Sequence, residues 1–346
     1  MFGLFIKLQA FIVSLIPNWT VVIDTETTSN HWQEAELLQL AIITGSGRVL
    51  FNKYFKPETA TEWPEAQKFN HIDPKMVKHC KRFSYYIPLV NAYLRHTRNI
   101  IGYNAGAYDV PLLEKYGVIF HHKKTIDIML DDTERRTKPG EHWRPSWRKL
   151  VVVARHYMYW YFAHDALEDC LATLHIHTLM HPGLCTITYF LRKIIQFLVC
   201  YLMVGGCFGL QTTENVSFPN AIFLTSLFTV GSAYIYGPFI GVLSTLMASL
   251  TFFPNFINGI PFMAMALFAG VFYKLFMVKQ GWGRILLGFI ITLIIVFVCI
   301  YIVPVYLIQI YPIIYLGFDN CLFIAGLTSF SIPFYFMIEK IIRHII

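Results

Sequence analysis

Charged residues are scarce in this chain of 346 residues. Asp, Glu, Lys and Arg make up 14% of it, against about 25% in ordinary soluble domains, and the mean hydropathy is +0.50. The shortage lies in the second half: residues 184–346 hold seven basic and three acidic residues, whereas residues 1–183 hold 21 and 18. This excludes an ordinary soluble fold for residues 184–346. It predicts that they lie in a membrane, behind a water-soluble first domain.

Two further absences narrow the class of protein. The seven cysteines form no C-x-x-C pair, and five lie in the apolar half. We interpret them as reduced thiols or small apolar side chains rather than zinc ligands or disulfide partners.

Residues 1–18 are apolar but too short to span a bilayer. No small-residue cleavage site follows them. This favours a hydrophobic lead-in that packs on the domain or on the membrane surface over a signal peptide.

The first half alternates short apolar runs with turn signals. These runs predict strands at residues 21–24, 37–43, 48–53 and 99–104. Helical patterns follow at residues 57–80, 109–116 and 163–180, with a further segment from residue 125. Three strands followed by alternating helices and strands predict an α/β or α+β sandwich.

Two carboxylates end the first predicted strand. Asp24 and Glu26 are separated by one residue, so their side chains point to the same face of the strand. Two acids held side by side repel each other unless a cation lies between them. The pair therefore predicts a divalent-metal site, with a chance pair on an exposed strand as the equally weighted alternative.

More titratable residues follow at two later places. Asp109 begins a predicted helix, where a simple N-cap is the alternative interpretation. His164 and Asp169 are five residues apart, close enough to share one side of a helix when the His lies on the turn before it.

Charged runs between residues 127 and 149 have plainer interpretations. We interpret Asp127, Asp131 and Asp132 as a solvated run without a chemical role. The basic stretch at residues 135–149 either follows a phosphate backbone or forms a solvated face. The net charge of +7 is spread over both halves, so affinity for nucleic acid must come from a local patch.

The acidic motifs together carry a resemblance. Asp24-x-Glu26, the run from Asn104 to Asp109, and His164-x4-Asp169 resemble, in order and spacing, the three motifs of the DnaQ-like 3′–5′ exonucleases. That family has a ribonuclease H-like fold, a mixed sheet with flanking helices, and one variant uses His as general base. The resemblance covers about residues 19–180, within a predicted domain of residues 19–183.

This resemblance implies a site and a substrate. It implies that Asp24, Glu26, Asp109 and Asp169 bind two Mg²⁺ (or Mn²⁺) ions, and that His164 accepts a proton from the attacking water. It implies contacts to nucleic acid from Thr25, Thr27, Asn104 and Tyr108. The expected partner is the 3′ end of single-stranded DNA or RNA.

The second half predicts an all-α domain of six membrane spans. They fall at about residues 187–209, 218–236, 238–254, 256–277, 285–309 and 319–340. Lys and Arg cluster at the start of the first span, between the fourth and fifth, and at the chain's end. The positive-inside rule then places both termini and the first domain in the cytoplasm, on a multi-pass protein of the cell (inner) membrane.

A second resemblance covers this half. Gly237-Pro238-x2-Gly241, Gly259-Ile260-Pro261-Phe262 and Phe318-Asp319 follow the order seen in the S components of energy-coupling-factor vitamin transporters, most closely BioY. The resemblance implies a vitamin such as biotin as substrate and an energising module of ATPases and a T component as partner. Asp319 is the candidate pocket residue, with an ordinary interfacial acid as the alternative.

The sequence thus predicts an exonuclease joined to a vitamin-uptake module in the bilayer. Two alternatives stay open. One is a transporter S component whose exonuclease domain is accessory or inactive, and the other is an RNA-processing exoribonuclease anchored to the membrane.

Overall fold

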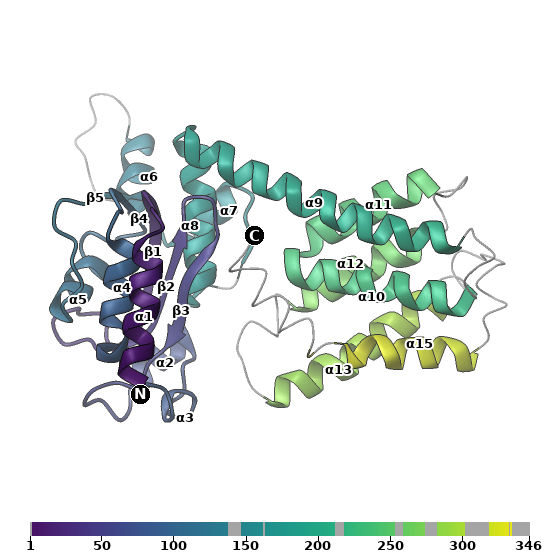
Figure 1. Cartoon of the computed structure of the whole chain (residues 1–346), viewed down its shortest axis with the longest axis horizontal. Helices are drawn as coiled ribbons and strands as arrows, with labels where there is room; N and C mark the ends of the chain where they lie inside the picture. The colour runs from purple at the N-terminus through teal and green to yellow at the C-terminus, as the bar shows by residue number, and fades with distance from the viewer. Residues whose placement is uncertain are drawn as a thin grey trace. The chain divides into compact units, whose positions relative to one another are not determined.

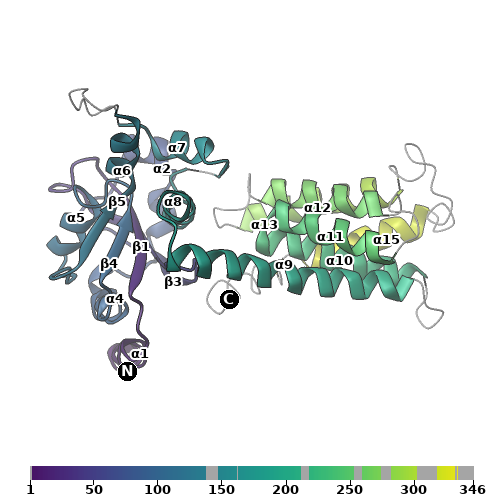
Figure 2. The ribbon, with the colours of Figure 1, turned by 90° about the horizontal axis from the view of Figure 1, so that it is seen from above.

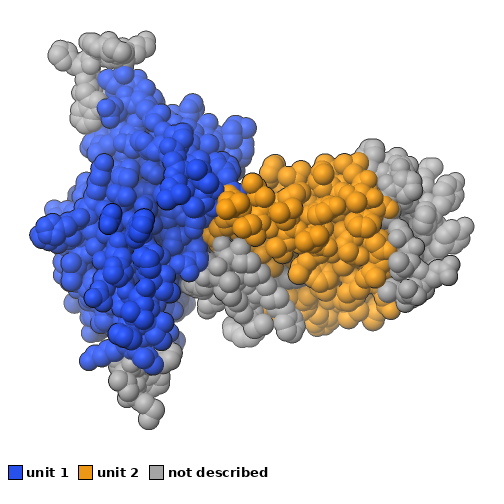
Figure 3. All heavy atoms as spheres, turned by 45° about the horizontal axis from the view of Figure 1, so that its top comes forward, with its two compact units in different colours: residues 1–190 blue, residues 191–346 orange. Residues whose placement is uncertain are grey.

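The computed structural model describes residues 2–137, 147–161, 163–211, 218–252, 259–273, 282–301, 318–331 and 333. The chain forms two compact units, residues 1–190 and 191–346 (Figure 3). The division falls inside helix α9 (Leu184–Gln211), a few residues after the change of composition at residue 183.

Unit 1 is built on a five-stranded mixed sheet. Its strands are β1 (Thr20–Thr27), β2 (Leu37–Thr44), β3 (Val49–Tyr54), β4 (Asn99–Gly102) and β5 (Lys124–Asp127), in the order β3-β2-β1-β4-β5 (Figure 1). β2 is antiparallel to β1 and β3, whereas β4 is parallel to β1 and β5. The predicted strands are confirmed, and a mixed sheet with flanking helices fits a ribonuclease H-like exonuclease fold.

Helices cover both faces of this sheet (Figure 2). On one face, Val21 and Ile23 of β1 pack with α4 (Ile87–Leu94) and α5 (Asp109–Lys115). Val22, between them, packs on the other face with α8 (Ala166–Met180). Asp24 and Glu26 continue the series of Val22, because side chains alternate along a strand. The sheet therefore directs both carboxylates toward α8.

The remaining helices of unit 1 are short. They are α1 (Phe2–Ser14), α2 (Pro64–Asn70), α3 (Pro74–Val77), the 3₁₀ turn η1 (Phe83–Tyr86), α6 (Ile128–Arg136) and α7 (Leu150–His156). The apolar lead-in of the sequence is the helix α1, which packs along α4 through Ile6, Ala10 and Val13. The last helix begins at Ala166, three residues later than predicted, because Asp165 caps it.

In the part of the chain that the structure describes, unit 2 is formed by apolar helices around one core. They are α9, α10 (Phe218–Tyr236), α11 (Pro238–Phe252), α12 (Ile260–Phe272), α13 (Trp282–Phe297) and α15 (Phe318–Phe330). Among the described residues, only α9 is long and apolar enough to cross a membrane. Parts of the spans predicted at 256–277, 285–309 and 319–340 lie outside the described residues, so the six-span arrangement stays a prediction.

Two glycines of unit 2 allow close packing between its helices. A Cβ added to Gly270 of α12 would lie 2.7 Å from the Cα of Pro238 on α11. A Cβ on Gly241 would lie 2.9 Å from the Cβ of Ala233 on α10. Any larger residue would push these helices apart, so the two glycines have a packing role rather than only marking helix ends.

Candidate functional site

The predicted site residues converge at the carboxyl end of β1. Asp24 and Glu26 come from β1, Asp109 from the first turn of α5, and Asp169 from the first turn of α8. A cavity of about 590 Å³ opens there. Its lining includes Asp24, Glu26, His164 and Asp169.

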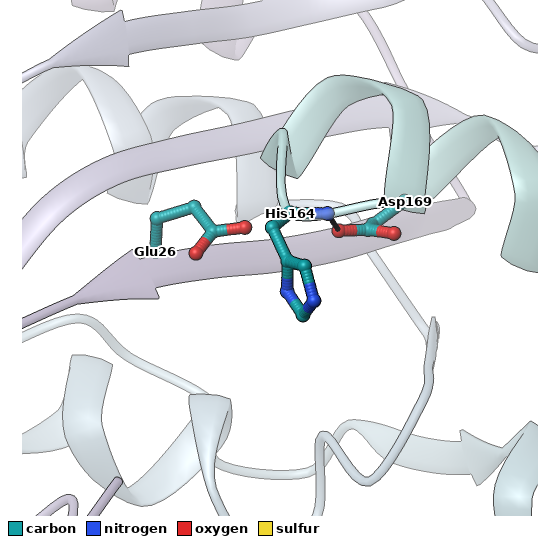
Figure 4. A group of neighbouring side chains, drawn as sticks. All are labelled: Glu26, His164 and Asp169. Atoms are coloured by element: carbon teal, nitrogen blue, oxygen red, sulfur yellow. Dashed lines mark hydrogen bonds between the residues drawn. The ribbon is translucent and has the colours of Figure 1, made fainter. Parts of the chain in front are cut away.

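The tightest cluster joins β1 to the start of α8. One side-chain ligand atom from each of Glu26, His164 and Asp169 lies within 4.8 Å of the other two (Figure 4). Both carboxylates are buried, whereas His164 is exposed. Carboxylate oxygens with an imidazole nitrogen form a donor set that suits a divalent cation such as Mg²⁺ or Mn²⁺. The residues present therefore fit the metal that the sequence predicted.

His164 is held by its backbone. Its φ of 69° lies in the left-handed region, which is uncommon for a residue other than glycine. Its N–H donates to Oδ2 of Asp169 over 2.9 Å, and its ring lies edge-on to the ring of Phe69 at 6.0 Å between centroids. The unusual backbone conformation thus brings the imidazole and the Asp169 carboxylate to one place.

Asp165 fixes the loop that carries His164. Its carboxylate accepts from the N–H groups of Leu167 and Glu168 at the start of α8. It also accepts from the Gln39 amide of β2 and the Tyr54 hydroxyl of β3, at 3.4 and 3.3 Å. One side chain thus caps the helix and ties it to the sheet. Asp165 had no predicted role, although an Asp just before a helix is a capping signal.

Asp109 lies deeper than the other acids. It is 4% exposed, and the Thr25 hydroxyl donates to its Oδ1 over 2.5 Å. Burial is the main cause that raises the pKa of Asp109 to about 7, and the hydrogen bond from Thr25 opposes the rise. Asp109 is therefore more than a helix cap, because it shares the buried charge of the site with Asp24.

Burial and mutual repulsion raise the pKa of the other acids. Burial raises the pKa of Asp24 well above its usual range, and the charges of Asp169 and Asp109 add to the rise. The pKa of Asp169 rises to about 7, mainly through burial. Within the described residues, no Lys or Arg forms an ion pair with these three acids. The raised pKa values favour the protonated acids when no metal is bound, and bound cations would take the place of those protons.

Burial likewise raises the pKa of Tyr161, with the charges of Asp169 and Asp24 as further causes. Tyr161 lines the cavity. It is therefore a neutral phenol at the pH at which the acids lose their protons. In the sequence, Tyr161 belongs to an aromatic run at residues 156–162, and nothing in that run signals a neighbour of the site acids.

The residues expected to contact nucleic acid divide into two groups. Thr25, Thr27 and Asn104 line the cavity. Tyr108 is half-buried and packs against the α4–α5 layer. Its hydroxyl lies 2.7 Å from the Thr27 hydroxyl and donates to the carbonyl of Ser29. Tyr108 therefore braces the end of β1 in this structure.

One sequence interpretation is wrong. Asp132 is not part of a solvated run: it is 2% exposed and accepts from Nε of Arg136 and Nε of Arg148, both at 3.0 Å. A second bond joins it to Nη2 of Arg148. The i, i+4 spacing to Arg136 could have signalled the first pair. Arg148 is a cavity-lining residue, so Asp132 anchors one wall of the cavity.

Exposed rings on the cavity wall were also missed. Phe69 and Trp147 line the cavity and remain more than half exposed, and Lys149 lines it beside them. Lys138 and Arg144 of the predicted basic stretch lie outside the described residues. In unit 2, Asp319 is exposed in the first turn of α15. A negative charge at this end of a helix interacts favourably with the helix dipole.

One family model matches part of unit 1. Residues 21–177 match the family model described as Exonuclease. No curated protein matches the chain. The comparisons bring no support for a vitamin-transporter module in residues 184–346.

Several solved structures are similar. E. coli exonuclease I in complex with a dA16 oligonucleotide is 19% identical, with a TM-score of 0.39, over 49% of this chain and 42% of that one. The complex with a dT13 oligonucleotide is 19% identical, with a TM-score of 0.40, over 50% of this chain and 43% of that one. The chain thus spans less than half the length of these proteins.

Proposed function

We propose that unit 1 is a metal-dependent exonuclease that removes nucleotides from the 3′ ends of single-stranded DNA or RNA. One observation carries the proposal: Glu26, His164 and Asp169 place their ligand atoms within 4.8 Å of one another, inside a region that matches the Exonuclease family model. Hydrolysis of a phosphodiester needs charge stabilisation and an activated water, and such a cluster is suited to both.

The acids would hold the metal ions. Asp24, Glu26, Asp109 and Asp169 are the proposed ligands of two Mg²⁺ or Mn²⁺ ions. When bound, such ions supply Lewis-acid stabilisation and a nucleophilic water. The exposed imidazole of His164 would accept the proton of the attacking water, which is the role of a general base. Asp165 acts through His164, because it holds the loop in position.

The cavity wall supports a single-stranded substrate. Phe69 and Trp147 present exposed rings, on which unpaired bases stack whatever their sequence. Lys149 is exposed at the same wall and is suited to a phosphate. Thr25, Thr27 and Asn104 offer polar groups beside the proposed metal ligands. A base paired in a duplex would not reach these rings.

Unit 2 would place this activity at a membrane. Its apolar helices and the length of α9 support a multi-pass protein of the cell membrane, with both termini and the exonuclease in the cytoplasm by the distribution of Lys and Arg. Uptake of a vitamin such as biotin, with an energising module, rests on the sequence resemblance alone. Cells that express the chain with such a module and take up no labelled biotin would contradict it.

Replacing Asp24 by Asn tests the nuclease. The variant keeps the shape of the side chain but loses the charge, so we expect activity on a labelled single strand to fall on the order of 10³-fold. Glu114→Gln is the matched control, because Glu114 is exposed at the far end of α5. A chelator should abolish wild-type activity and Mg²⁺ restore it. Full activity of Asp24→Asn would remove the proposal.

A further inference from the structure

Helix α1 has two apolar faces, and only one of them packs on the domain. Ile6, Ala10 and Val13 lie on the face that contacts α4. Leu8, Phe11, Ile12 and Leu15 follow the i, i+3, i+4, i+7 spacing of a single helix stripe and are 53–65% exposed. At 100° per residue, this stripe lies on the side of the helix opposite to the packed one.

Basic side chains lie close to residues 14–19, at the carboxyl end of α1 where the exposed stripe ends. Nη1 of Arg95 lies 3.5 Å from the Ser14 hydroxyl, and Nη2 of Arg48 lies 3.4 Å from Oδ1 of Asn18. The guanidinium of Arg98 lies 5.5 Å from the centre of the Trp19 ring, which is itself 59% exposed. The border thus combines arginines with an exposed tryptophan.

No acidic residue opposes these charges in the surrounding segments. Residues 2–23, 43–49, 87–99 and 117–124 contain six Lys or Arg and no Asp or Glu. Every acid of the proposed site lies beyond them, at or after the carboxyl end of β1. An apolar stripe with an exclusively basic border and a Trp at its end is the pattern of a helix that lies in a membrane interface.

We infer that α1 rests on an anionic bilayer surface, with Leu8, Phe11, Ile12 and Leu15 in the acyl boundary and Arg48, Arg95 and Arg98 among lipid phosphates. The inference rests on the membrane placement proposed for unit 2. It adds a second contact that would fix how unit 1 stands on the bilayer. The carboxyl end of β1, with the nuclease cavity, would then lie at the end of the strand away from the basic border.

A photoreactive residue in the full chain tests this contact. We would place p-benzoylphenylalanine at position 15 directly after α1, at position 198 in α9, or at position 69 at the cavity, and reconstitute each protein in phosphatidylglycerol bilayers. Leu15, Leu198 and Phe69 are all exposed apolar residues. Illumination should yield lipid adducts at positions 15 and 198 and none at 69.

The charge border is tested in the same assay. Arg95→Gln with Arg98→Gln should lower the lipid adduct at position 15 by about fivefold per arginine and leave the adduct at 198 unchanged. With both arginines present, phosphatidylcholine bilayers should lower the lipid adduct at position 15 by the same factor, because they carry no net negative charge. Unchanged hydrogen exchange in the sheet would show that the double variant is folded.

Two outcomes overturn the inference. Lipid adducts at position 198 with none at position 15 would show that unit 2 is in the bilayer but α1 is not. Adducts at position 15 that join two copies of the chain would make the stripe a protein interface. If position 198 also fails to label lipid, the proposed membrane placement falls with it.

Discussion

Asp132 and the acids of the proposed site, all in unit 1, differ in their partners. Asp132 is buried between the guanidinium groups of Arg136 and Arg148. Asp24, Asp109 and Asp169 face one another and, among the described residues, pair with no Lys or Arg. Buried charges need a compensating charge. The first acid has one from the chain, whereas the second set needs protons or metal ions. The partner, rather than burial, distinguishes a structural acid from a functional one.

Removing the structural acid should have the largest effect on stability. Asp132→Ala leaves two arginine side chains without their anion, and we expect α6 and the cavity wall to lose about 3–5 kcal/mol. Hydrogen exchange of the α6 amides would measure this loss. Asp131→Ala is the control, since its bond to His181 is exposed, and it should cost less than about 1 kcal/mol. Equal losses in the two variants would mean that the ion pairs of Asp132 add nothing to the stability of α6.

The acids of the proposed site should make the stability of unit 1 depend on pH. Their pKa values are raised in the folded, metal-free protein, to about 7 for Asp109 and Asp169, against about 3.9 in an unfolded chain. Their contribution to stability is therefore full below pH ~4 and lost as the pH rises toward 7. Mg²⁺ binds the deprotonated acids, so the stability it adds should grow over the same range.

Hydrogen exchange of the β1 and α8 amides, with and without Mg²⁺ from pH 5 to pH 8, would follow this change. The slope for each acid is at most about 1.4 kcal/mol per pH unit. In Asp169→Asn the metal-free slope should diminish. A metal-free sheet whose stability rose over this range would contradict the raised pKa values.

The smallest expected effect concerns the hydroxyl on Asp109. Thr25→Val removes the hydrogen bond that opposes the raised pKa of Asp109, worth about 1 kcal/mol. The pKa of Asp109 should rise further, so the pH profile of nuclease activity should shift upward and half-maximal activity should need several-fold more Mg²⁺. An unchanged profile would show that Thr25 does not tune the acid.

Local patterns predicted much of unit 1. Alternation along β1 was enough to place Asp24 and Glu26 on one face, and the order of the motifs anticipated that Asp109 and His164 would meet them. The bond between Asp132 and Arg148 was not predictable, because the two are 16 residues apart and meet only through the fold. Asp132 therefore looked like one of three solvated acids.

The direction of side chains was the second feature that the sequence could not predict. Tyr108 is next to a site acid in the sequence, which suggested a contact with substrate, yet its hydroxyl points to Ser29 and Thr27. The apolar composition of residues 1–18 indicated a lead-in that packs on the domain or on the membrane surface, but composition does not reveal that α1 has two apolar faces. In unit 2, hydropathy locates apolar segments without setting helix length, and both ends of the span predicted at 256–277 lie outside the described residues.

Because the backbone of His164 is left-handed, its side chain can be removed without disturbing the loop that carries it. Glycine adopts a φ near 69° without a Cβ clash, so His164→Gly would delete the imidazole while relaxing the backbone that carries it. The N–H that bonds Asp169 would remain. The vacated space opens onto the cavity, so free imidazole added to the solution could enter where the ring had been. The chemical role of the imidazole and the structural role of the His164 backbone can thus be measured separately.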